Sequence, residues 1–469
     1  MAETEPPTDT TAADGASLDL GGALYGLKPA VVRAIVDAAQ TGDARLVRRL
    51  IHPLHYSDVA DLIERLDPET RDRVLEYTGR TLDPKVLAEL DDQVREQIVE
   101  QLDTKQIVAA ATELETDDAV ELIEDLDKET AEEVLEALPE EEREAIEEAL
   151  SYPEESAGRR MQSETVVVPV TWTVGETIDH MRESVDLPTD FYDVFVVDQL
   201  GKPIGTIPLN RLLRTRRPVK IGQIMKGDLT VIPATMDQEE AALLFKQRDL
   251  TSAPVVDENG KLVGMITVDD MVDVIEKETE EDMLRLAGVA ESDIHFPAMT
   301  TAQLRIRWLI VTLCNTIVAS IVISQFQATI EKIVALAVLM PIVAAMGGNA
   351  GMQVVTVTVR ALATKHLTPG NMFRVVRKEV LVGLMNGVAL AAVMGTITAF
   401  WFHNTSLSLV LAGAMLFNMI WAGIAGTLIP LALFRMRIDP AIAAGPFLTT
   451  TTDVLGFFVF LGVATLFLI

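Results

Sequence analysis

The chain has 469 residues and carries 70 acidic against 39 basic side chains, a formal net charge of −31. That length predicts several domains, and so large an acidic excess argues against a nucleic-acid-binding protein and favours cations or basic partners. The single cysteine, Cys314, excludes an intramolecular disulfide.

The charge is unevenly distributed along the chain. Residues 300–469 hold ten Lys/Arg and four Asp/Glu, which leaves 29 and 66 for residues 1–299, a net charge of −37 there. Long apolar runs fill the C-terminal part, so we predict an acidic soluble body followed by a membrane domain. Residues 1–22 are acidic and lack the basic and apolar regions of a secretory signal, which predicts a disordered tail.

Residues 23–155 predict an all-α superhelix of short helices. Leucines recur at intervals of twelve residues or twice that, from Leu54 to Leu150, and several are followed by an aspartate. An aspartate there can cap the next helix, and short stacked helices build a solenoid. Asp117 and Glu121 lie four residues apart and share a helix face. This face is either solvated, which is the commoner case, or meets another acidic surface with a cation between.

Residues 156–276 repeat a pattern of strands and helices in two copies, 156–220 and 221–276. FVVDQLGKPIGTIP in the first aligns with PVVDENGKLVGMIT in the second. The pattern resembles a pair of CBS (cystathionine-beta-synthase) domains, an α+β regulatory module that often binds adenine nucleotides. Gly264, Thr267 and Asp270 keep the nucleotide signature of that family and imply a candidate ATP site, whereas Pro208 and Arg211 replace it in the first copy. A structural pair without nucleotide is the equally weighted alternative.

After the second copy no helix breaker occurs before Gly288, which predicts an acidic helix that leads to the membrane. We assign residues 277–302 to this connecting, plug-like segment. Asp270 and Asp273 share one face, and so do Glu278 and Asp282. Such a run is usually only solvated, but like charges repel one another unless counter-ions lie between them.

Residues 303–469 predict an α-helical transmembrane domain of five spans. All of the ten basic residues but Lys332 lie at the connections on one side of the spans. The positive-inside rule therefore places the N-terminus in the cytoplasm and the C-terminus outside. In the second span, three glycines and two amides in GGNAGMQ predict a bent or broken helix with carbonyls that line a water-filled path. Alternatively, the glycines only allow close helix packing. The spans are approximately Trp308–Phe326, Lys332–Ala363, Glu379–Trp401, Ser406–Phe434 and Asp439–Ile469.

Asp453 lies inside the last span, directly after four threonines. A carboxylate in a span costs about 2.5–3.5 kcal/mol and normally faces a watery path or a partner. The pattern therefore favours a cation site in a pore over an aspartate at the helix mouth bonded to a neighbouring span. The residues that we expect to line this pore, besides Asp453, are Gly348, Asn349, Gly351, Gln353, Thr449 and Thr450.

PIVAAMGGNAGMQVVTVTVRALA and DPAIAAGPFLTTTTDVLGFFVFLGVA resemble the MgtE family of magnesium channels and transporters, and the domain order is similar too. The resemblance implies a homodimer in the cell (inner) membrane that takes up Mg²⁺ through Asp453 of each subunit. It also implies regulation by intracellular Mg²⁺ bound to acidic clusters of the body. Met352 departs from the small or polar residue that is common in the family motif. The candidate regulatory ligands are Asp117, Glu121, Glu239, Asp249, Asp270, Asp273, Glu278 and Asp282.

Other functions fit the sequence less well. No Walker A loop, HExxH or G-x-S-x-G motif indicates an enzyme. The pore carboxylate and the scarcity of basic residues within the spans argue against an anion channel. Two alternatives remain: a membrane Mg²⁺ sensor that transports nothing, and a transporter of Mn²⁺ or Co²⁺. The sequence also does not distinguish Ca²⁺ from these ions as the transported cation.

Overall fold

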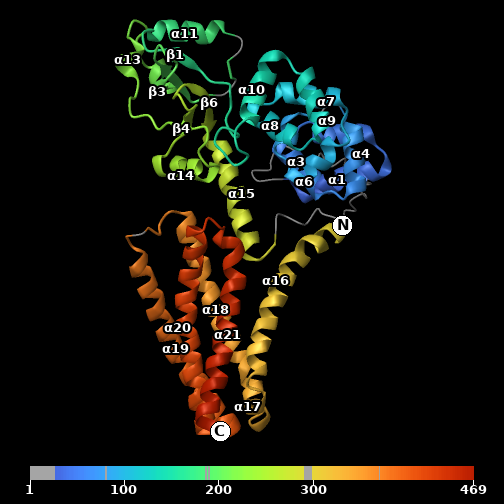
Figure 1. Cartoon of the computed structure of the whole chain (residues 1–469). Helices are drawn as coiled ribbons and strands as arrows, with labels where there is room; N and C mark the ends of the chain where they lie inside the picture. The colour runs from blue at the N-terminus through green and yellow to red at the C-terminus, as the bar shows by residue number, and fades with distance from the viewer. Residues whose placement is uncertain (1–26, 80–81, 185–186, 189–190, 290–297, 369) are drawn as a thin grey trace, which may run out of the picture. The chain divides into compact units, whose positions relative to one another are not determined.

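The computed structural model describes residues 27–79, 82–184, 187–188, 191–289, 298–368 and 370–469 (Figure 1). The predicted acidic tail lies outside these residues. The chain forms two compact units, residues 1–272 and 273–469. Each unit is described by itself below.

The first unit begins with a solenoid of short helices. Asp67, Asp91, Asp103 and Asp127 cap α4, α6, α7 and α9, each accepting a hydrogen bond from a backbone amide of the first turn. The recurring leucines line the core, so the predicted repeat is confirmed. The helices are α1 (Pro29–Thr41), α2 (Ala44–Ile51), α3 (Tyr56–Arg65), α4 (Pro68–Thr78), α5 (Lys85–Ala88), α6 (Asp92–Val99), α7 (Thr104–Glu113), α8 (Thr116–Glu124), α9 (Lys128–Ala137) and α10 (Glu140–Leu150).

Two small sheets of identical topology follow, one in each predicted copy. In both sheets the first strand pairs parallel to the second, the second pairs antiparallel to the third, and the register shifts near the end of the second strand. This identity confirms the tandem repeat. The elements are β1 (Val167–Pro169), α11 (Val174–Glu183), β2 (Asp193–Val197), β3 (Pro203–Pro208), α12 (Leu209–Leu213), α13 (Ile221–Ile224), β4 (Ile232–Pro233), α14 (Gln238–Arg248), β5 (Ser252–Val256) and β6 (Leu262–Thr267).

The acidic connecting helix is α15 (Val268–Leu286). It begins directly after β6 and ends just before Gly288, as the absence of an earlier helix breaker predicted; the assignment of residues 277–302 to a connecting segment stays a prediction. Gly288, at φ +73°, follows its end, as expected for a residue that tolerates the left-handed conformation. Residues 290–297 of the predicted segment lie outside the described residues.

Among the described residues of the second unit, five helices are long and apolar enough to cross a membrane, which confirms the predicted number. They are α16 (Ala298–Ser324), α18 (Ala335–Ala363), α19 (Met372–Phe402), α20 (Thr405–Arg435) and α21 (Pro440–Leu468), with the short α17 (Gln327–Lys332) after the first. α20 packs against α18, α19 and α21, and α18 also packs against α21. These contacts place α18, α20 and α21 side by side (Figure 1).

The expected break in the second span is wrong, because α18 continues through the glycines without interruption. The glycines instead allow close helix packing. A Cβ added at Gly351 would lie 2.7 Å from Leu448 Cδ1 on α21, and one added at Gly426 on α20 would lie 2.8 Å from the Gly351 carbonyl oxygen. Neither neighbour leaves room for a side chain, so the glycines bring the helices together.

Candidate ion site and acidic cluster

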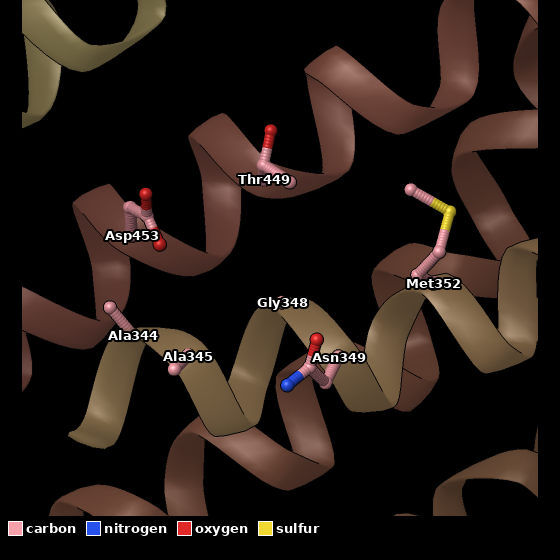
Figure 2. A pocket seen from close by; sticks show the side chains of 7 residues that line it. All are labelled: Ala344, Ala345, Gly348, Asn349, Met352, Thr449 and Asp453. Atoms are coloured by element: carbon pink, nitrogen blue, oxygen red, sulfur yellow. The ribbon is translucent and has the colours of Figure 1, made fainter. Parts of the chain in front are cut away.

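A pocket of about 340 Å³ lies between α18 and α21 in the membrane unit (Figure 2). Asp453 and Thr449 line it from α21, and Gly348 and Asn349 line it from α18. These residues were all expected at the pore. Ala344, Ala345 and Met352 complete the lining.

The two walls of this pocket differ in chemistry. On α18, Ala344 and Gly348 lie four residues apart and offer little side-chain bulk; on α21, Thr449 and Asp453 have the same spacing and offer oxygen atoms. Figure 2 shows Thr449 over Gly348, and Asp453 on the side of Ala344. At the other end of the pocket the large side chain is on α18 and the small residue is on α21. There Met352 of α18 reaches toward Gly445 of α21, and a Cβ added at Gly445 would lie 3.2 Å from Met352 Cε.

The Asp453 carboxylate is half-buried, and no hydrogen bond or ion pair with the residues described in this structure engages it. It is therefore not the aspartate bonded to a neighbouring span that the sequence left as an alternative. Thr449 Oγ1 donates to the backbone carbonyl oxygens of Gly445 (3.2 Å) and Pro446 (3.1 Å). Since its one hydroxyl hydrogen is used there, its lone pairs remain as acceptors. The pocket thus offers acceptors to a cation or to its water shell.

Three expected pore residues lie elsewhere. Gly351 packs against Leu448, Gln353 is exposed outside the pocket lining, and Thr450 Oγ1 donates to the Pro446 carbonyl oxygen at 2.7 Å. Conversely, Ala344, Ala345 and Met352 were missed. The signal that could have found them is helical spacing from Gly348, but small apolar residues in a span usually indicate packing.

A buried acidic cluster occupies the first unit, where Asp117 and Asp118 in the first turn of α8 meet Asp270 in the first turn of α15. Gln162 lies between them and donates from Nε2 to Asp270 Oδ2 (3.3 Å) and, weakly, to Asp117 Oδ2 (3.5 Å). Asp117 is 7% exposed, and its Oδ1 has no hydrogen-bond partner within the described chain. An unpaired buried carboxylate oxygen is a hard ligand of the kind that Mg²⁺ prefers, although the side chains of the described residues do not converge here as a preformed metal site would.

The cluster is electrostatically unfavourable without counter-ions. Burial, followed by the charge of Asp270, raises the pKa of Asp117 well above its usual range and that of Asp118 to about 7. Burial also raises the pKa of Asp270, although hydrogen bonds from Thr267 oppose this shift. At neutral pH the three carboxylates must share protons, separate or take up a cation.

Glu121, which was expected beside Asp117, is instead paired with cations. Arg95 is 4% exposed and donates from Nη1 to Glu121 Oε2 (3.0 Å) and from Nε to Asp125 Oδ2 (2.5 Å). Arg160 forms a second ion pair with Glu121. The expectation that Glu121 faces an acidic surface is therefore wrong, because two arginines distant in sequence neutralise it.

The other candidate metal ligands are dispersed. Glu239 lies in the first turn of α14, and Asp249 follows the last turn in the left-handed conformation at φ 51°, so α14 separates them. Asp273 and Glu278 lie along α15. Burial and the charges of Asp439 and Glu278 raise the pKa of Asp282. Within the described ranges, no group of three or more His, Cys, Asp or Glu side chains converges as a metal site would.

The nucleotide signature of the second copy is occupied by contacts within the chain. Thr267 donates from its backbone nitrogen (3.1 Å) and from Oγ1 (2.6 Å) to Asp270 Oδ2. A Cβ added at Gly264 would lie 2.6 Å from the Gln162 carbonyl oxygen. A nucleotide would have to replace the Thr267–Asp270 hydrogen bonds with its own.

Comparisons with known proteins agree with this architecture. A family model for a divalent cation transporter matches residues 340–463, one for the MgtE intracellular N domain matches residues 54–155, and a CBS domain model matches residues 221–277. Among solved structures, the cytosolic domain of the Mg²⁺ channel MgtE in complex with ATP has a TM-score of 0.48 and 29% identity, and the match covers 52% of this chain and 99% of that one.

Curated relatives extend the match across most of the chain. The magnesium transporter MgtE of Thermus thermophilus is 34% identical over 321 residues, which cover 68% of this chain and 71% of that protein. The magnesium transporter MgtE of Bacillus subtilis is 31% identical over 320 residues, with the same coverage. With its five apolar helices, the chain is a multi-pass membrane protein, and it belongs to the MgtE family of magnesium transporters.

Proposed function

We propose that this chain conducts Mg²⁺ along the pocket between α18 and α21, with Asp453 as the ion-binding group. The observation that carries the proposal is a half-buried carboxylate that forms no hydrogen bond or ion pair with the described residues, in a pocket walled by small residues and a threonine oxygen. Mg²⁺ gives up its water reluctantly and is usually bound through one or two carboxylates and several retained waters. One aspartate with room for water suits such an ion.

The assembly that we propose is a homodimer in the cell (inner) membrane, in which each subunit contributes one Asp453. The N-terminus lies in the cytoplasm and the C-terminus outside. The basic residues of the connecting loops support this orientation. Arg360 and Arg435 lie in the last turns of α18 and α20, and Lys365 and Arg437 follow in the loops after these helices.

Intracellular Mg²⁺ regulates transport in this proposal. Ions bind the cluster of Asp117, Asp118 and Asp270, and they bind acidic residues along α15 such as Glu278 and Asp282. Each ion removes the repulsion between carboxylates that otherwise drives the acidic segments apart. Binding therefore shifts the population toward the state in which the pore is closed. The unpaired Asp117 Oδ1 and the raised carboxylate pKa values support the first site. ATP is a second candidate regulator, at Gly264, Thr267 and Asp270.

Flux into proteoliposomes that contain a Mg²⁺-sensitive dye tests the transport proposal. Asp453→Ala should abolish flux, and Asp453→Asn should be nearly as damaging because an amide keeps the shape but loses the charge. Glu331→Gln is the matched control, since Glu331 is an exposed carboxylate of the same unit outside the pocket. If Asp453→Ala conducts like the parent, the proposed pathway is wrong. If the parent conducts nothing but still responds to Mg²⁺, the chain is a sensor.

A further inference from the structure

A buried amide lies where α18, α20 and α21 meet. Asn418, in the middle of α20, is 1% exposed, and its Nδ2 donates to the Val343 carbonyl oxygen of α18 at 2.9 Å. Exchanging the amide nitrogen and oxygen would oppose two oxygen atoms, so the acceptor fixes the orientation of the side chain. Asn418 therefore ties α20 to the backbone of α18.

Two glycines make room for this amide, one on each neighbouring helix. A Cβ added at Gly347 on α18 would overlap Asn418 Nδ2 and lie 2.7 Å from Cγ. A Cβ added at Gly456 on α21 would lie 2.9 Å from the same nitrogen. The amide thus occupies the space that side chains would fill at both positions, and it is wedged between α18 and α21.

These two contacts lie at the level of the ion pocket. Gly347 directly precedes Gly348 and Asn349, and Gly456 follows Asp453 by three residues, less than one helical turn. The amide consequently contacts both helices that form the pocket walls, next to the residues that line them.

Packing alone does not account for an asparagine at this position. Asn418 Oδ1 is buried without a hydrogen-bond partner in the described residues, and an orphaned polar atom is costly in an apolar interior. A leucine has the same branching as asparagine and, although larger, carries no polar atom, so it would avoid that cost. What an asparagine adds is the directional hydrogen bond to Val343, which holds α18 at one position along α20.

We propose that Asn418 is a positioning residue for ion transport: it fixes the spacing of α18 and α21 and thereby the width of the pocket that Asp453 lines. This inference rests on the proposed pathway. Without the Asn418 donor, the distance between α18 and α21 at the pocket varies more. A hydrated Mg²⁺ ion is therefore bound more weakly. The half-saturating Mg²⁺ concentration for flux rises, and discrimination against the larger Ca²⁺ ion falls.

The test uses the full-length chain in proteoliposomes and measures half-saturation and the Ca²⁺/Mg²⁺ flux ratio. Asn418→Leu, which keeps the branching of the side chain but removes the donor, should raise half-saturation by about threefold or more. Gly347→Ala should reduce flux at least about tenfold, because its methyl group overlaps the amide. The double variant Gly347→Ala/Asn418→Ala should recover most of that loss, since the methyl group then enters the vacated space.

Gly413→Ala is the matched control on α20, where an added Cβ meets no atom within 4 Å; it should behave like the parent. Half-saturation does not depend on the amount of folded protein, so partial misfolding lowers only the maximal flux. The inference is overturned if Asn418→Leu keeps parental half-saturation and ion discrimination, or if the double variant is no better than Gly347→Ala. Retained flux in Asp453→Ala would instead overturn the pathway itself.

Discussion

Arg285, near the C-terminal end of α15, donates from Nη1 to Asp439 Oδ2 at 2.9 Å. Asp439 is also the N-cap of α21, and its Oδ1 accepts from the Ala441 backbone nitrogen at 2.8 Å. The neighbouring Leu286 packs against a buried cluster that includes Ala441 and Ala444. The end of the connecting helix is therefore attached, by an ion pair and by apolar contact, to the beginning of the helix that carries Asp453.

This attachment predicts that Arg285→Gln weakens regulation by Mg²⁺. Both side chains are about 30% exposed, and ion pairs with solvent access contribute about 0.2–1 kcal/mol. We therefore expect the half-inhibitory Mg²⁺ concentration in a flux assay to rise roughly two- to fivefold. Arg248→Gln, an exposed arginine of α14, is the control. An unchanged half-inhibitory Mg²⁺ concentration would show that the Arg285–Asp439 ion pair does not couple α15 to the regulation of flux.

The acidic cluster predicts an unusual dependence of stability on pH. Burial raises the pKa of Asp118 from its ordinary value of 3.8 to about 7, so between these pH values the folded protein binds more protons than the unfolded chain. The free energy of unfolding therefore falls as the pH rises through this window. At pH 8, millimolar Mg²⁺ should restore the lost free energy of unfolding. At pH 5 it should have little effect, because protons already neutralise the carboxylates of the acidic cluster.

Thermal unfolding of the full-length chain in detergent, from pH 5 to pH 8 with and without Mg²⁺, measures this effect. Asp118→Asn should flatten the pH dependence and reduce the stabilisation by Mg²⁺. Asp72→Asn, at an exposed position of α4, should leave both unchanged. Equal stabilisation by Mg²⁺ at pH 5 and pH 8 would contradict a carboxylate site of raised pKa.

The fold was predictable where local chemistry decides it, and the site was predictable only in part. Asp67 and Asp103 cap helices because the interaction spans three residues. Asp453 and Gly348 were expected in one pocket because a carboxylate or a glycine inside an apolar run is conspicuous. Glu121 was misassigned because its partner Arg160 approaches only in the folded chain. No sequence pattern near Glu121 reveals such a tertiary contact.

The buried Arg95 of α6 predicts a large loss of stability on truncation. Arg95→Ala leaves Glu121 and Asp125 partly buried, without the guanidinium that bonds both. Removing one partner of a buried ion pair typically costs about 3–5 kcal/mol. Urea unfolding should show a loss in this range for Arg95→Ala. Arg65→Ala, which removes an exposed pair with Asp61, should cost less than about 1 kcal/mol; similar losses in both variants would refute a central role for Arg95.

The asymmetry of the two CBS copies predicts at most one ATP per subunit. Thr267 and Asp270 supply a hydroxyl and a carboxylate at the end of β6, whereas Pro208 and Arg211 occupy the equivalent places after β3. Proline has no donor, and arginine cannot accept hydrogen bonds from ribose hydroxyls. Calorimetry should therefore give a stoichiometry no higher than one. Asp270→Ala should abolish binding and Arg211→Ala should preserve it. Two equivalent sites per subunit, or binding indifferent to Asp270→Ala, would place the nucleotide elsewhere.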